Sequence, residues 1–92
     1  MSAAKKEIPL TIDKRVINLL ATELGIADKE QIRTDSTLYD LGAGENDAFL
    51  ISEKLEEEFS IEFNDEDDKN IKAVDKITVS AIVKLVKEKT PN

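Results

Sequence analysis

The sequence predicts an all-α fold, a bundle of helices of unequal length. Apolar residues recur at the three- and four-residue spacing of a helix face near residues 12–24, 45–59 and 79–89. Residues that favour helix ends stand at the borders of these segments. No segment alternates apolar and polar residues over the length of a half-buried strand. With a short additional helix after residue 64, the pattern indicates four helices.

The first expected helix follows Thr11, whose hydroxyl can cap the free amides of a helix start. Gly25 is placed to end it, because glycine readily adopts the left-handed conformation of a C-cap. The helix carries one apolar stripe, which consists of Ile12, Val16, Ile17, Leu19, Leu20 and Leu24. Residues 1–9 are polar and end in a proline, so we expect a flexible tail before a single domain over residues 10–90.

The helical spacing disappears over residues 26–44, where turn-forming residues predict a long loop. A loop of this length in a small domain is usually functional or belongs to a specific architecture. Apolar side chains are expected to attach it to the core, namely those of Ile32, Leu38, Tyr39 and Leu41.

The second expected helix covers residues 45–59. Positions about 100° apart around its axis give one buried stripe, formed by Ala48, Ile51, Leu55 and Phe59. Phe49 and Leu50 fall outside this stripe among polar and acidic residues, namely Asn46, Glu53, Glu56 and Glu57. An exposed apolar pair bordered by acids indicates a docking surface. The alternative for Phe49 is packing beneath a neighbouring short helix.

The last part of the chain predicts two further helices. Ile61 and Phe63 should point inward before a short helix or turn over residues 65–70. Thr78 is a candidate N-cap for the final helix, which should end near residue 89. Its expected buried residues are Val79, Ile82, Val83 and Val86.

Composition excludes several function classes. The 92 residues include 20 acids, 13 bases and no Cys or His, and the net charge is −7. Disulfides, thiolate chemistry and the common zinc ligands are therefore absent. Residues 25–68 hold 15 acids against three bases, which argues against nucleic acid or anionic membranes and favours a basic protein partner. No apolar run resembles a signal peptide or membrane span, so we expect a cytoplasmic chain without membrane insertion. We also expect it to be a monomer.

The acidic residues 65–68 raise the question of a calcium site. A calcium loop counted from Asp65 would need Gly at its sixth position and Glu at its twelfth, but the chain has Asn70 and Lys76 there. Acids in the first turn of a helix also stabilise its dipole, which explains them without a metal. No apolar pocket frames a carboxylate pair, so we expect neither a metal site nor enzyme activity.

Three blocks carry a resemblance to a known family: residues 21–26 (ATELGI), 35–43 (DSTLYDLGA) and 55–63 (LEEEFSIEF). From Ile12 to Lys87 the chain resembles an acyl carrier protein. In that family, the turn continues with Asp-Ser-Leu, and the serine carries 4′-phosphopantetheine. The aligned residues here are Gly44, Glu45 and Asn46. The resemblance therefore implies the fold of a carrier protein but no attachment serine and no phosphopantetheine cofactor.

The resemblance also bears on docking, because family members bind basic enzymes through their second helix. It implies that acidic recognition positions are retained at Asp47, Glu56 and Glu57. The apolar anchors have become Asn46 and Glu53, and Leu50 replaces an acid. The third helix or the segment after it should be longer than in the family by about five residues, near residues 75–79.

Together these features predict a non-carrying docking or regulatory module. Its partner would present Arg and Lys around an apolar notch. The expected partner-binding residues are Asn46, Asp47, Phe49, Leu50, Glu53, Glu56 and Glu57. The alternative is a genuine carrier in fatty-acid, lipid or polyketide metabolism that uses a non-standard attachment site. Ser36, Ser52, Ser60 and Ser80 lack the family turn before them, and Ser52 is expected to hydrogen-bond within its own helix.

Overall fold

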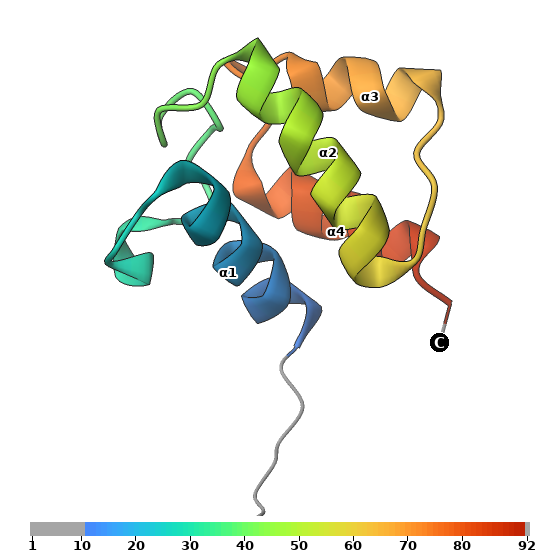
Figure 1. Ribbon diagram of the computed structural model, residues 1–92, viewed down its shortest axis with the longest axis horizontal. Helices are drawn as coiled ribbons and strands as arrows, with labels where there is room; N and C mark the ends of the chain where they lie inside the picture. Colours follow the sequence, from blue (N-terminus) through green and yellow to red (C-terminus); the bar gives the residue numbers. More distant parts are fainter. Residues whose placement is uncertain (1–10, 92) are drawn as a thin grey trace, which may run out of the picture.

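The computed structural model describes residues 11–91, and this part of the chain is all-helical (Figure 1). The elements are α1 (Ile12–Leu24), the 3₁₀ helix η1 (Lys29–Gln31), α2 (Glu45–Phe59), α3 (Asp65–Lys72) and α4 (Val79–Lys89). The fold class, the long loop and the short third helix are confirmed. The predicted tail over residues 1–9 lies outside the described residues.

The helices begin and end where their capping residues stand. The Thr11 hydroxyl accepts a hydrogen bond from the Lys14 amide at 3.2 Å, and Gly25 ends α1 in the left-handed conformation with φ 68°. The Thr78 hydroxyl accepts from the Ala81 amide at 3.1 Å and opens α4. Capping therefore explains why these two helices match the predicted boundaries.

The helices bury one common core. In Figure 1, α2 passes in front of α4, α1 lies beside them, and α3 lies across one end of the bundle. The expected stripes of α2 and α4 both face this core. Its fully buried side chains include Val16 and Leu20 of α1, Ile51 and Leu55 of α2, and Ile82 and Val86 of α4. Ile61 and Phe63 are also buried, as predicted.

The long loop between α1 and α2 is fastened to the segment between α3 and α4. The Leu38 amide donates to the Ile77 carbonyl at 3.1 Å, and the Tyr39 amide donates to the Val74 carbonyl at 2.9 Å. Leu38 is buried as expected, but the prediction for Tyr39 is wrong because its side chain is 67% exposed. Tyr39 attaches the loop through its backbone instead of its ring.

The helices within residues 11–91 are too short or too polar to cross a membrane.

Candidate functional site

The start of α2 is built by a turn at Gly42 and by the side chain of Asp47. Gly42 has φ 90°, a conformation that favours glycine, and the Ala43 amide then donates to the Leu38 carbonyl at 2.9 Å. The Asp47 carboxylate accepts the Gly44 amide at 2.9 Å. Glu45 follows as the first helical residue, with its side chain exposed. Two carboxylates thus stand in the first turn, where the helix dipole favours negative charge.

A shallow hollow of about 750 Å³ lies beside this helix start. Its lining residues come from the end of the long loop and from the segment after α3, namely Tyr39, Asp40, Gly42, Ala43, Gly44 and Val74. The reciprocal bonds between Asp40 and Thr37, at 3.0 and 3.1 Å, hold the loop beside it. The turn before α2 is therefore a fixed part of the surface.

Two large apolar side chains of α2 are exposed next to acids. Phe49 is 51% exposed and Leu50 is 47% exposed. Glu53 and Glu57 follow one and two turns later, and both are exposed. The Lys72 ammonium of α3 lies over the Phe49 ring, 5.7 Å from its centroid, but leaves the side chain half exposed. The alternative in which Phe49 packs beneath a short helix is therefore wrong. We call Asn46, Phe49, Leu50, Glu53 and Glu57 the α2 face.

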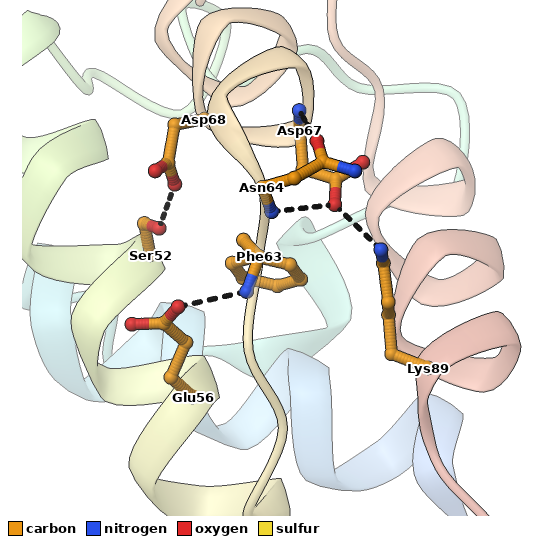
Figure 2. Close-up of polar contacts among 7 residues, drawn as sticks. All are labelled: Ser52, Glu56, Phe63, Asn64, Asp67, Asp68 and Lys89. Atoms are coloured by element: carbon orange, nitrogen blue, oxygen red, sulfur yellow. Dashed lines mark hydrogen bonds and ion pairs between the residues drawn. The ribbon is translucent and has the colours of Figure 1, made fainter.

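Glu56 is used inside the molecule, although the sequence placed it on the docking surface. Its Oε2 accepts the Phe63 amide at 2.8 Å, and the residue is only partly exposed (Figure 2). This bond fastens the segment between α2 and α3 against α2. Asp47 is likewise partly exposed and engaged with Gly44. The assignment of both residues to partner binding stays a prediction, but each already has a structural role.

Ser52 does not hydrogen-bond within its own helix, so that expectation is wrong. Its hydroxyl donates to the Asp68 carboxylate of α3 at 2.8 Å, and Ser52 is 7% exposed. Figure 2 shows Ser52 and Glu56 on the side of α2 that faces α3 and the segment leading to it. The side of α2 next to α3 is therefore closed by polar contacts.

The acids at the start of α3 serve the helix and the end of α4. Asn64 and Asp67 exchange side-chain-to-amide bonds of 2.8 and 3.0 Å, which form a capping box. The Lys89 ammonium lies 2.8 Å from the Asp67 carboxylate (Figure 2). The hydrogen bond from Lys89 is the main cause that lowers the pKa of Asp67 below its ordinary value, against the opposing effect of burial. Among residues 11–91, no cluster of three or more acids is arranged to hold a metal ion.

A second surface, which the sequence analysis missed, lies between α3 and α4. It is an open groove of about 460 Å³. Ile77 and Leu85 are half-buried in it, whereas Ala81 is exposed. Two lysines, Lys76 and Lys84, and one acid, Glu88, line the same groove and are exposed. The available signal was the four-residue spacing of Ala81 and Leu85, which marks a second apolar stripe on α4, with Ile77 four residues earlier, just before the helix. We call Lys76, Ile77, Ala81, Lys84 and Leu85 the α4 groove.

The comparison with protein families matches residues 14–73 to the phosphopantetheine attachment site family. The chain belongs to this family. The match includes most of α1, the long loop, α2 and α3, and it ends at the residue after α3. Membership agrees with the four-helix fold and with the resemblance to acyl carrier proteins. Domains of this family typically serve as carriers and not as catalysts.

The group that names this family is 4′-phosphopantetheine, which family carriers hold on a serine at the start of the second helix. The corresponding turn of this family member contains Glu45, Asn46 and Asp47 and offers no hydroxyl. The nearest serine along α2 is Ser52, whose hydroxyl is buried against Asp68. These residues do not fit a phosphodiester-linked arm at the start of α2.

Proposed function

We propose that this member of the phosphopantetheine attachment site family acts as a non-carrying docking or regulatory module. The observation that carries this proposal is the exposed pair Phe49 and Leu50 on α2, bordered by the exposed acids Glu53 and Glu57. A small domain gains little from exposing two large apolar side chains side by side, so such a pair is typical of an interaction site. The α2 face is the proposed binding surface.

The chemistry of Glu45 supports a function without a carried group. A serine hydroxyl forms a stable phosphodiester, whereas a carboxylate attacking the same phosphate would give a labile mixed anhydride. Glu45 also occupies the helix start with its own negative charge, which the dipole stabilises as it would a phosphate. The helix therefore keeps an anion at this position without a prosthetic group.

The proposed partner is a protein with Arg or Lys around an apolar notch. Phe49 and Leu50 would fill the notch, and the surrounding charges would exclude water and select the orientation. The 15 acids in residues 25–68 would raise the rate of encounter with such a surface. Binding should weaken as salt is added, because screening shortens the range of this attraction.

Intact-mass measurement tests the absence of carriage. The full chain is incubated with coenzyme A and a broad-specificity phosphopantetheinyl transferase, and an ordinary carrier protein is the positive control. We expect an unchanged mass for this chain beside a modified control. One added phosphopantetheine arm would overturn the proposal in favour of a carrier with a non-standard attachment site, which peptide mapping would then locate.

A capture experiment tests the docking surface. The chain and its E53K/E57K variant are immobilised and exposed to lysate from the source cells, and retained proteins are identified by mass spectrometry. The matched control is E30K/E62K, because it reverses two exposed acids outside the α2 face. We expect a protein that binds the wild type and the control but not E53K/E57K. Equal retention by all three would refute the surface. Glu56 is left unchanged because it holds the Phe63 amide.

A further inference from the structure

The α4 groove has the chemistry that the proposed function requires of a partner. Ile77, Ala81 and Leu85 form its apolar part. Lys76 and Lys84 provide positive charge, which Glu88 in the same lining offsets in part. Residues 69–92 carry six bases against two acids, in contrast to the acidic middle of the chain. The same molecule therefore presents an acidic apolar face and a basic apolar groove.

These two surfaces cannot meet within one molecule. The buried residues of α2, such as Ile51 and Leu55, and those of α4, such as Ile82 and Val86, contribute to the same core. Because a helix exposes the side opposite to its buried stripe, the exposed sides of α2 and α4 point away from each other. Contact between them requires a second copy of the chain.

The groove is held in position by backbone bonds and needs no local folding to receive a partner. The Ile77 carbonyl accepts the Leu38 amide at 3.1 Å, and the Val79 amide donates to the Ser36 carbonyl at 2.9 Å. These bonds fasten the start of α4 to the long loop. A fixed groove lowers the entropic cost of binding.

We propose that the α4 groove of one copy binds the α2 face of a second copy. Phe49 and Leu50 would contact the apolar part of the groove, with Glu53 and Glu57 near its lysines. This inference rests on the proposed function, because it takes the α2 face to be a protein-binding surface. The contact joins two different surfaces, so it builds head-to-tail chains. The net charge of −7 opposes association, so the chain should be monomeric when dilute and associate only when concentrated.

Sedimentation velocity from low micromolar to near-millimolar concentration tests this contact. We expect the wild-type sedimentation coefficient to rise with concentration. E53K/E57K should associate at least about tenfold more weakly than the wild type. This variant changes the net charge from −7 to −3, which reduces general repulsion between copies, so weaker association would point to the α2 face itself. The control E30K/E62K has the same net charge and should associate at least as well as the wild type.

The groove is tested separately with K76E/K84E and its control K14E/K29E, which reverses two exposed lysines outside the groove. K76E/K84E alone should stay monomeric, whereas the control should associate more than it does. An equimolar mixture of K76E/K84E and E53K/E57K should associate again, because each variant then finds a surface of opposite charge on the other.

Several outcomes would overturn the inference. One is a wild-type chain that stays monomeric at the highest concentration, and another is a mixture of the two variants that fails to associate. Association of K76E/K84E equal to that of its control would also exclude the groove. Circular dichroism of each variant shows whether it is folded. None of these outcomes affects capture of another protein by the α2 face, so failure here is distinguishable from failure of the proposed function.

Discussion

The Asp67–Lys89 ion pair holds the end of α4 against the start of α3. Removing the Lys89 ammonium should therefore lower the unfolding free energy of the whole domain by a measurable amount. We consider Lys89→Met, which keeps most of the aliphatic side chain and removes the ammonium. The variant leaves Asp67 with its bond from the Asn64 amide but without its ion pair. Asp67 would then be a mostly buried carboxylate without a counter-ion.

The expected loss follows from the geometry of the pair. The two atoms are 2.8 Å apart, and the side chains of Lys89 and Asp67 are 28% and 12% exposed. A hydrogen bond to a charged group contributes about 1.5–3 kcal/mol, and the remaining exposure places this pair near the lower end. A loss of about 1.5 kcal/mol corresponds to a fall in Tm of roughly 6–12 °C for a domain of this size.

The loss should depend on pH with a defined sign. In the folded chain the pKa of Asp67 lies below the ordinary value of 3.8, mainly because of the bond from Lys89. Its contribution to stability is therefore complete above the ordinary pKa and is lost as the pH falls through the folded pKa. The difference in unfolding free energy between wild type and Lys89→Met should be largest at neutral pH and should shrink in acid, once the pH falls below the lowered pKa of Asp67.

Urea unfolding followed by circular dichroism gives this difference directly. Lys87→Met is the matched control, because Lys87 lies on the same helix and pairs with Asp13 at 3.1 Å with both side chains about half exposed. Such an exposed pair should contribute about 0–1 kcal/mol. Equal losses for the two variants at neutral pH would refute the reasoning, as would a Lys89→Met loss that does not shrink in acid.

Three further outcomes are expected. Glu45→Ser should gain little or no phosphopantetheine in the intact-mass assay, because both neighbours of this position also differ from the Asp-Ser-Leu motif; full modification would contradict this. Glu56→Ala should lose about 1.5–3 kcal/mol in urea unfolding by leaving the Phe63 amide unpaired, whereas Glu56→Gln keeps an acceptor and should lose less. An equal loss for the exposed control Glu57→Ala would contradict that role. Ser52→Ala should lose about 1 kcal/mol through its contact with α3, and an unchanged unfolding midpoint would argue against that contact.

The helices could be predicted because their signals are local. Thr11, Gly25 and Thr78 fix helix ends through bonds within a few residues, and the apolar spacing identifies the buried sides. The same spacing placed Phe49 and Leu50 outside the buried stripe, but for Phe49 it left packing beneath a short helix open. Local signals were sufficient for features that depend on a single helix, namely its ends and its buried side.

Contacts between elements could not be predicted in this way. The bonds of Ser52 with Asp68 and of Glu56 with Phe63 depend on how α3 and the segment before it lie against α2. Spacing along one helix contains no such information. The exposure of Tyr39 was missed for a related reason, because the bond that holds it is made by its backbone to Val74.

The acids of α2 therefore differ in what they offer a partner, although the sequence shows them as one cluster. Asp47 and Glu56 accept backbone amides, and Glu58 pairs with Arg15 of α1 at 3.0 Å. Family resemblance assigns recognition to Asp47, Glu56 and Glu57, whereas the structure leaves Glu53 and Glu57 exposed beside the apolar pair.

A partner that binds the α2 face should lose more affinity when the charge of Glu53 is reversed than when the charge of Asp47 is reversed, once variants are compared at equal folded fraction. Asp47 is already bound to the Gly44 amide and is only partly exposed, so part of its charge is used to hold the helix start. Reversal of Glu53 changes an exposed side chain on the proposed surface without breaking such a bond. The opposite ranking in a binding titration would mean that recognition follows the family positions and is centred on the helix start.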